Sequence, residues 1–282
     1  MRALATLFIT SLVFITCEIP SRNLGHFAYI QIDDLKLKVA SNQGADSDNF
    51  KDAWVFVDGR SNGVYEIPRK VPIAFEAGSS TLINIQAGIR ENGVNSAPIV
   101  FPFVNTYQMN LEFDDLETVN LQPVFEYIPE TKFRIVEDFE GSNRFTFDED
   151  RDTSTLLTLS NSNPASGLFS GEIIVPGTDT VEIGSTLVYN EIPVNGTPVF
   201  LEIEYYGDVD LDIGLIGEKG GQFFKDYFVS LRSEREWKKA YINLTSLVVA
   251  SGLEGYQVLM RAINQDEDEA MVLVDNIKLL HF

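Results

Sequence analysis

Apolar and polar residues alternate with a period of two along most of the chain from residue 27 onward. Such alternation is typical of strands with one buried and one exposed face. Asp-Gly and Asn-Gly pairs, which supply the positive φ angles of tight hairpins, recur between the runs. No stretch keeps a 3.6-residue period over the length of an ordinary helix, and only residues 246–253 suggest a short helical turn. The pattern predicts an all-β chain of sandwiches or barrels. The clearest examples are residues 29–31, 35–39, 54–56 and 82–84, with turns at Asp58-Gly59, Asn62-Gly63 and Asn92-Gly93.

A separate apolar run occupies residues 3–16, behind Arg2. It is shorter than the roughly 20 residues that a membrane-spanning helix needs, and it suits the central region of a secretory signal. The run ends at Cys17, which is the only cysteine of the chain, so no internal disulfide can form. We therefore expect residues 1–16 to be a cleaved signal peptide.

The segment Phe14-Ile15-Thr16-Cys17 resembles the cleavage site of bacterial lipoproteins, with Phe14 where a Leu-like residue is usual. The resemblance, to lipoproteins of the Bacteroidota type, implies a lipid on Cys17, a tether over residues 17–25 and attachment to the outer membrane. In such lipoproteins a run of acidic residues directly after the cysteine often marks display on the cell surface. Here only Glu18 is acidic at that place, so the periplasmic and surface-exposed orientations both stay open. The alternative is a secreted protein cut nearby, in which Cys17 has no role.

The charge of the chain is strongly negative. Asp and Glu number 42 against 21 Lys and Arg, which gives a net charge of −21. A field of this sign repels nucleic acid, so no nucleic-acid partner is expected. A negative field is compatible with binding of calcium or of a basic partner, and it also keeps a protein soluble.

Two domains are expected after the tether. The segment Val55-Phe56-Val57-Asp58-Gly59, followed by the strand pattern at 79–90, resembles transthyretin-like, PEGA and immunoglobulin-like modules and implies a β-sandwich over residues 26–128. Residues 129–132 read as a linker. The opening segment 133–145 (FRIVEDFEGSNRF) and the closing segment 269–282 (EAMVLVDNIKLLHF) resemble jelly-roll domains of the carbohydrate-binding-module or galactose-binding-like class. That resemblance implies a second β-sandwich over residues 133–282.

The same resemblance implies one structural calcium ion. The matching acids are Glu137, Asp138 and Glu140 on the opening strand and Asp275 on the closing strand. Calcium takes six to eight oxygen ligands. In the alternative, Asp275-Asn276 holds its strand by local hydrogen bonds and the other acids are solvated. Calcium is the only cofactor that the sequence suggests.

Three further acidic segments have simpler explanations. Asp208, Asp210 and Asp212 share one face of a strand, which basic cross-strand partners or a cation would stabilise. The loop 148–152 has the spacing of a calcium loop, but Thr153 and Leu159 stand where an EF-hand needs Gly and Glu. Residues 264–269 are expected to form a charged hairpin tip.

Aromatic side chains that stack on sugar rings are the third kind of candidate site. The candidates are Tyr205, Tyr206, Phe223, Phe224, Tyr227 and Trp237, of which we predict Tyr206 and Tyr227 as ligand-binding residues. Tyr205 and Tyr206 are adjacent in a strand, so they face opposite sides of the sheet. Trp237 is expected to be a core residue, from its place in the jelly-roll resemblance.

Enzymatic activity is not expected. The two histidines, His26 and His281, have no nucleophile at a recognised spacing, and no zinc-protease, nucleophile-elbow or phosphate-loop motif occurs. Glu202-Ile203-Glu204 resembles the start of the acidic strand of jelly-roll glycosidases, but Tyr206 replaces the third acid. Asp179-Thr180-Val181 resembles an O-glycan acceptor of exported Bacteroidota proteins.

Three functions remain open at this point. The first is a non-catalytic, lipid-anchored binding or scaffold subunit of an outer-membrane protein complex. The second is a glycan-binding lipoprotein that uses the jelly roll, and the third and weakest is a glycosidase-like hydrolase. A flat apolar patch between the domains would favour a protein partner. A well-formed cleft with an exposed Tyr or Trp beside acids would favour a glycan.

Overall fold

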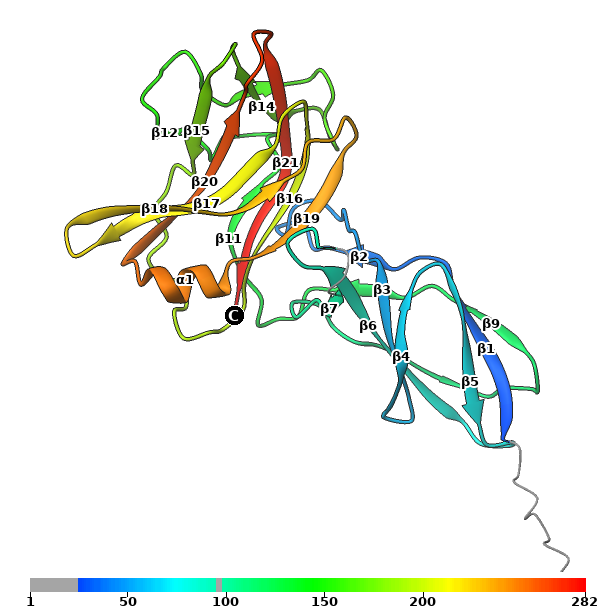
Figure 1. The fold of residues 1–282 in the computed structure, drawn as a ribbon. Coiled ribbons are helices and arrows are strands. Elements are labelled where there is room, and N and C mark those ends of the chain that lie inside the picture. The colour runs from blue at the N-terminus through cyan, green and yellow to red at the C-terminus, as the bar shows by residue number, and fades with distance from the viewer. Residues whose placement is uncertain (1–24, 95–97) are drawn as a thin grey trace, which may run out of the picture.

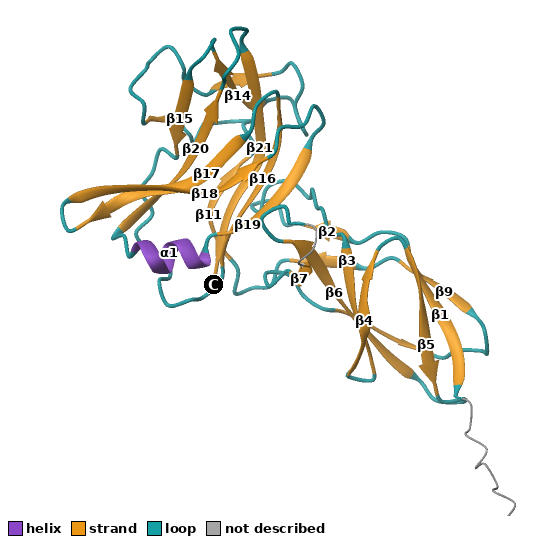
Figure 2. Ribbon diagram, viewed as in Figure 1, coloured by secondary structure: helices purple, strands orange, loops and turns teal. Residues whose placement is uncertain are grey.

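A computed structural model describes residues 25–94 and 98–282. Within these ranges the protein is β-structure apart from one short helix, so the prediction of an all-β chain is confirmed (Figures 1 and 2). The predicted signal peptide (1–16), the lipidation site Cys17 and all of the tether except Gly25 lie outside the described residues. No helix of the described part is long and apolar enough to cross a membrane.

Strands β1 to β10 form the first sandwich. One sheet has the order β4-β3-β6-β7, with β8 also paired to β6; the other elements are the sheet β5-β1-β9 and the pair β10-β2. The strands are β1 (His26–Ile32), β2 (Lys36–Lys38), β3 (Asp52–Val57), β4 (Arg60–Glu66), β5 (Arg69–Phe75), β6 (Thr81–Arg90), β7 (Pro98–Val100), β8 (Tyr107–Leu111), β9 (Thr118–Leu121) and β10 (Val124–Glu126).

Local sequence explains these strands well. Along β6 the side chains of Ile83, Ile85 and Ile89 are buried while the intervening residues are partly exposed near the start of the strand. The β3–β4 hairpin turns at Asp58 (φ 49°) and Gly59 (φ 76°), and two consecutive positive φ angles are the requirement of a tight type I′ turn.

Strands β11 to β21 form the second sandwich. One sheet has the order β13-β14-β21-β16-β19, with β11 also paired to β21, and the other has the order β12-β15-β20-β17-β18. The strands are β11 (Lys132–Glu137), β12 (Phe147–Asp148), β13 (Thr158–Ser160), β14 (Ser170–Val175), β15 (Thr180–Gly184), β16 (Val199–Gly207), β17 (Leu211–Lys219), β18 (Gln222–Leu231), β19 (Lys238–Asn243), β20 (Gly255–Ile263) and β21 (Ala270–His281).

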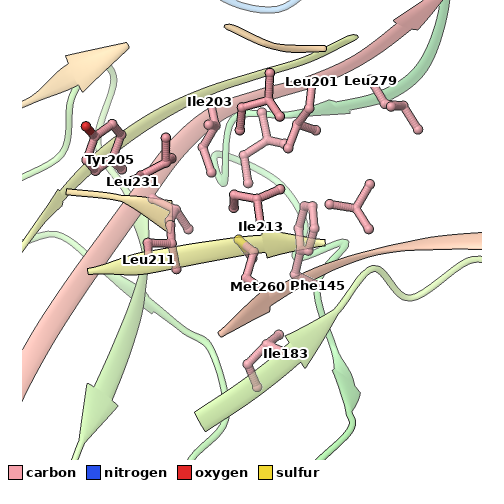
Figure 3. Close-up of a cluster of buried hydrophobic side chains, with 14 of the residues drawn as sticks. Phe145, Ile183, Leu201, Ile203, Tyr205, Leu211, Ile213, Leu231, Met260 and Leu279 are labelled. Atoms are coloured by element: carbon pink, nitrogen blue, oxygen red, sulfur yellow. The ribbon is translucent and has the colours of Figure 1, made fainter. Parts of the chain in front are cut away.

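Apolar side chains from both sheets meet between them (Figure 3). Leu201 and Ile203 of β16 and Leu279 of β21 lie on one side, opposite Ile213 of β17 and Met260 of β20. All five are at most 1% exposed. This filled interior leaves the loops and outer faces of the sandwich as the places where a ligand can bind.

Helix α1 (Thr245–Ser251) confirms the helical turn predicted over 246–253. It ends at Gly252, which adopts φ 56° and donates its backbone N–H to the Val248 carbonyl. A left-handed glycine at this position is a common way to end a helix. Leu247 and Val248 attach the helix to the core of the second sandwich.

The two sandwiches share buried apolar side chains. Phe200, Tyr241 and Leu280 point away from the core of the second sandwich and join the core of the first. The Tyr241 ring lies 5.0 Å from that of Phe101, and the Phe200 ring lies 5.7 Å from that of Phe103. Period two explains this arrangement, since neighbours such as Val199 and Leu201 fill the other face of the sheet.

A buried polar network lies beside this apolar contact. The Tyr127 hydroxyl donates to Glu202 Oε1 (2.6 Å) and accepts a hydrogen bond from Lys278 Nζ (3.2 Å). Lys239 Nζ forms an ion pair with Glu202 Oε2 at 2.7 Å. Lys278 also donates to the Ala45 carbonyl of the first sandwich (2.6 Å). These contacts connect one outer face of the second sandwich to Tyr127, which follows β10, and to the loop that precedes β3.

The charges in this network follow from its burial. Burial opposes ionisation of Glu202, but Lys239 and Lys278 together hold the pKa of its carboxyl below the usual range. Burial lowers the pKa of Lys278 to about 8, although Glu202 acts in the opposite direction. Burial and the Glu202 carboxylate both raise the pKa of Tyr127. The network is therefore a charged unit that is enclosed between the two sandwiches.

Backbone hydrogen bonds also cross the junction. Glu91, which follows β6, forms an isolated parallel bridge with Tyr241 on the edge strand β19. The Asn92 N–H donates to the Tyr241 carbonyl (2.8 Å), and the Asn243 N–H donates to the Asn92 side-chain oxygen (2.9 Å). The junction is therefore fixed by shared packing, buried charge and backbone pairing together.

Candidate functional site

A groove of about 760 Å³ lies where the two sandwiches meet, and we refer to it as the junction groove. Its volume is within the range of small-molecule sites. Residues 49, 51, 90, 92 and 93 of the first sandwich line one side, and residues 205, 230–232, 234 and 236–240 of the second sandwich line the other.

Hydrogen bonds hold the two walls of the groove in register. The side-chain amide of Asn49 donates to the Lys239 carbonyl (2.9 Å), and its backbone N–H donates to the Tyr241 hydroxyl (3.1 Å). Asn92 is fixed by the strand bridge described above. A groove with walls held in this way is largely formed before any ligand binds, which lowers the entropy cost of binding.

Trp237 lines the groove, so the prediction that it is a core residue is wrong. It is only partly buried and stands in the loop between β18 and β19, directly before β19 begins. Its indole N–H donates to the Asn163 carbonyl (3.0 Å). The ring of Tyr206 lies 6.0 Å from the Trp237 ring. Tyr206, predicted as a ligand-binding residue, therefore supports the groove aromatic but is not among the lining residues.

Charged and amide side chains surround Trp237. Lys238 forms ion pairs with Glu234 (3.0 Å) and Glu236 (3.4 Å), all on the same loop or the start of β19. Across the groove, Arg90 forms ion pairs with Asp52 (3.4 Å) and Glu66 (2.7 Å). The groove thus combines two aromatic residues, Tyr205 and Trp237, with carboxylate, guanidinium and amide groups.

Tyr227, the other predicted ligand-binding residue, lies away from the groove on an outer face of the sheet that contains β17 and β20. Its hydroxyl donates to Glu182 Oε1 (2.6 Å), and the Arg261 guanidinium lies 3.8 Å from its ring centre. Burial and Glu182 raise the pKa of Tyr227. One side of this ring is therefore occupied by Arg261, which makes Tyr227 a poorer stacking surface than Trp237.

Of Asp208, Asp210 and Asp212 only Asp212 lies in a strand, because β17 begins at Leu211, so the prediction that the three share one strand face is wrong. Asp212 pairs across the sheet with Arg261, whose Nη2 lies 2.6 Å from Oδ2. Asp208 forms an ion pair with Arg235 at 2.8 Å. Residues 264–269 connect β20 to β21, which belong to different sheets, so the segment is a loop between the two sheets and the predicted hairpin tip is wrong.

The predicted calcium ligands act as acceptors for loop N–H groups. Glu137 Oε1 accepts from Phe139 (2.8 Å) and Oε2 from Arg144 (2.7 Å). Glu140 Oε1 accepts from the Leu168 and Phe169 N–H groups, while the exposed Asp138 accepts from the Glu140 N–H. Burial of Glu137 raises its pKa despite these donors.

Asp275 is fully buried and accepts three backbone N–H groups, from Asn276 (2.7 Å), Ala165 (3.1 Å) and Ser166 (3.3 Å). Burial raises its pKa to about 7, which these hydrogen bonds oppose. Asn276 in turn donates to Glu204. These contacts support the alternative in which Asp275-Asn276 holds its strand by hydrogen bonds.

A calcium ion does not fit this donor set as it stands. No group of three or more His, Cys, Asp or Glu side chains in residues 25–94 and 98–282 is arranged to hold a metal ion. Glu137 and Asp275 already use both carboxylate oxygens for N–H groups. Calcium therefore stays a prediction from the sequence.

The remaining enzyme candidates lie outside the junction groove. Glu202 is 0% exposed and belongs to the buried network. His281 is buried against Arg134, and His26 pairs with Asp115. The sequence did not single out the groove residues Asn49, Asn92 and Arg232, since they come from separate loops and share no local motif.

Comparison with known proteins gives only distant structural likenesses. No protein-family model matches the chain, and no curated protein does. One similar solved structure, described as carbohydrate-binding modules from the β-sandwich superfamily, is 12% identical and covers 82% of this chain and 84% of its own, with a TM-score of 0.39. A family 22 carbohydrate-binding module of Clostridium thermocellum is 13% identical over 53% of this chain and 92% of its own (TM-score 0.37). A family 11 module of a cellulosomal cellulase from the same organism is 13% identical over 54% and 95% (TM-score 0.37). Because these TM-scores lie below 0.5, the likenesses do not indicate what the present chain binds.

Proposed function

We propose that this protein binds a glycan in the junction groove. The observation that carries the proposal is the position of Trp237, a partly exposed indole that lines a groove of about 760 Å³ beside Glu234 and Glu236. Aromatic rings offer a large flat apolar surface for the C–H faces of sugars. Carboxylate, guanidinium and amide groups around the ring supply donors and acceptors for hydroxyl groups.

The shape of the junction favours this function over the first hypothesis from the sequence. A protein partner at the junction would be expected on a flat apolar patch, whereas the junction groove is hollow and mostly lined by polar residues. The enclosed position of Glu202 argues against the glycosidase hypothesis, because a catalytic carboxylate must reach the glycosidic bond. The proposed function is therefore non-catalytic binding.

A protein partner remains a second candidate at a different place. The β17–β18 hairpin extends away from the second sandwich (Figure 1). Phe223 at its tip is 81% exposed, and Phe224 and Phe228 on the same strand are 39% and 38% exposed. Large exposed aromatics on an edge strand are typical of association surfaces. This hairpin is the surface through which a scaffold subunit would contact an outer-membrane partner.

We also propose that the protein is held at the outer membrane by a lipid on Cys17. The support is the sequence alone: a short apolar run with Arg2 before it and the lone cysteine after it. In this arrangement the first sandwich, which follows the tether, lies nearest the membrane, and the junction groove lies farther along the molecule.

A glycan array tests the proposed function directly, followed by titration of each bound glycan against the full-length protein. Trp237→Ala is expected to weaken binding at least tenfold, which corresponds to about 1.4 kcal/mol. Trp237→Phe is expected to retain part of the affinity, because it keeps an aromatic ring.

Trp54→Phe is the matched control, since Trp54 lies on β3, outside the groove, and is the only other tryptophan of the chain. It is expected to bind as the native protein does. Native affinity in Trp237→Ala, or an array without any bound glycan, would refute the proposed function.

A further inference from the structure

We infer that the junction groove selects an anionic glycan, through Lys51 and Arg232. This inference rests on the proposed function and specifies its ligand class. The groove lining contributes five basic side chains against two carboxylates, in a chain with twice as many acids as bases. The basic residues are Lys51, Arg90, Arg232, Lys238 and Lys239, and the acidic residues are Glu234 and Glu236.

Three of these five cations already have protein partners. Lys239 is directed into the buried network, where it pairs with Glu202. Lys238 pairs with the two lining glutamates, and Arg90 pairs with acids of the first sandwich. These three contribute little free positive charge to the groove, because each is offset by carboxylates within 4 Å.

Lys51 and Arg232 differ from the other three. Neither forms an ion pair with any residue in 25–94 or 98–282, and both are exposed. They come from opposite walls of the groove: Lys51 directly precedes β3 of the first sandwich, and Arg232 directly follows β18 of the second. The fixed junction therefore presents two cations of different sandwiches to one ligand space.

The chemistry of the pair indicates an acidic sugar. The planar guanidinium of Arg232 can donate two parallel hydrogen bonds to a carboxylate or sulfate group. Lys51 supplies a compact positive charge from the other wall. Trp237, which lines the same groove, would stack on a ring of the same chain. A glycan that carries a carboxylate or sulfate group satisfies both features at once.

The net negative charge of the whole protein opposes non-specific binding of an acidic glycan. A net charge of −21 repels polyanions in general, so non-specific attraction does not favour an acidic glycan. Any preference for the acidic form over its neutral analogue must therefore arise at a local site.

The test uses pairs of glycans that differ only in charge, titrated against the full-length protein in detergent. The panel contains oligogalacturonate and its methyl ester, glucuronoxylan and its carboxyl-reduced form, and a sulfated galactan and its desulfated form. The native protein is expected to bind the acidic member of at least one pair at least tenfold more tightly than the neutral member. The carboxylate and sulfate pairs show which acidic group is recognised.

Lys51→Gln with Arg232→Gln is expected to abolish this preference while the affinity for the neutral member stays within about twofold. Arg60→Gln with Lys132→Gln changes the net charge by the same amount outside the groove, and it is expected to keep the preference. Equal binding of both members by the native protein, or a preference that survives in the groove double variant, would overturn the inference and leave glycan binding intact. Absence of binding to every member, with the array also blank, would overturn the proposed function itself.

Discussion

Replacing Glu202 by Gln is expected to destabilise the whole protein by about 3–5 kcal/mol, the usual cost of removing one partner of a buried ion pair. The substitution is nearly isosteric and keeps an acceptor for the Tyr127 hydroxyl, which lies 2.6 Å away. What it removes is the negative charge 2.7 Å from Lys239 Nζ. The Lys239 side chain is 2% exposed, so water cannot replace the lost carboxylate.

Urea unfolding followed by far-UV circular dichroism measures this cost. Because the two sandwiches share buried side chains, we expect one transition whose midpoint falls while its slope is unchanged. Glu126→Gln is the matched control. Glu126 forms an ion pair of the same length, 2.7 Å, with Lys38, but the two side chains are 56% and 70% exposed. Its loss is expected to cost far less than the loss of Glu202, because water screens an exposed pair.

The pH dependence adds a second check on the same pair. The folded state holds the pKa of Glu202 below its unfolded value of about 4.3, so its stabilisation is complete above that value and is lost as pH falls through the folded pKa. The stability difference between the native protein and Glu202→Gln should therefore shrink in acid. A cost near that of Glu126→Gln at pH 7 would refute the assignment of this network as the charged contact between the sandwiches.

Three further predictions concern other residues. Lys278 has a pKa of about 8 in the folded state and about 10.4 in the unfolded state, so the free energy of unfolding, measured in urea, should rise by about 2 kcal/mol between pH 7 and pH 10. Lys278→Met should lose this rise, and a native protein whose free energy of unfolding does not change over this pH range would contradict the assignment. Asp275→Ala removes the acceptor of three backbone N–H groups and should cost at least about 2 kcal/mol, whereas the exposed Asp138→Ala should cost under about 1 kcal/mol. If a chelator lowers the melting temperature of the native protein, the hypothesis that Asp275 binds calcium is supported. If the melting temperature is unchanged, only the hydrogen-bonding role of Asp275 stands. Cys17→Ala should move the protein from the membrane fraction to the soluble fraction, and unchanged sedimentation with membranes would exclude the lipid anchor.

Features that depend on neighbouring residues could be predicted from the sequence. The Asp58-Gly59 hairpin and the alternation along β6 are local, and both are present as expected. Helix α1 was identified for the same reason. A basic cross-strand partner for Asp212 was expected because an acidic side chain on a strand needs one, but the sequence did not identify that partner as Arg261.

The junction could not be predicted, because its residues are far apart along the chain. Tyr127 and Glu202 are 75 residues apart, and Tyr127 and Lys278 are 151 apart. One signal was present: β16 and β21 carry apolar residues on both faces, as at Val199-Phe200-Leu201, which indicates a strand covered on both sides. A single sequence does not say which segment covers the second face.

Trp237 shows a different limit. Its expected burial came from the resemblance of the segment that follows it to a core strand. The strand begins only at Lys238, so the period-two rule does not extend to residue 237. The loop position exposes part of the indole and makes it available to a ligand.

The shared core also sets an order of events during synthesis. When the ribosome has made β10, the first sandwich has its own strands, but Phe200, Tyr241 and Leu280 are still to be made. Until they arrive, Phe101 and Phe103 lack the side chains that cover them. The nascent first sandwich therefore carries an uncovered apolar end, which a chaperone would have to protect until β21 is released. A fragment cut after residue 128 keeps that end permanently, so expression of the first sandwich alone should yield an aggregating protein.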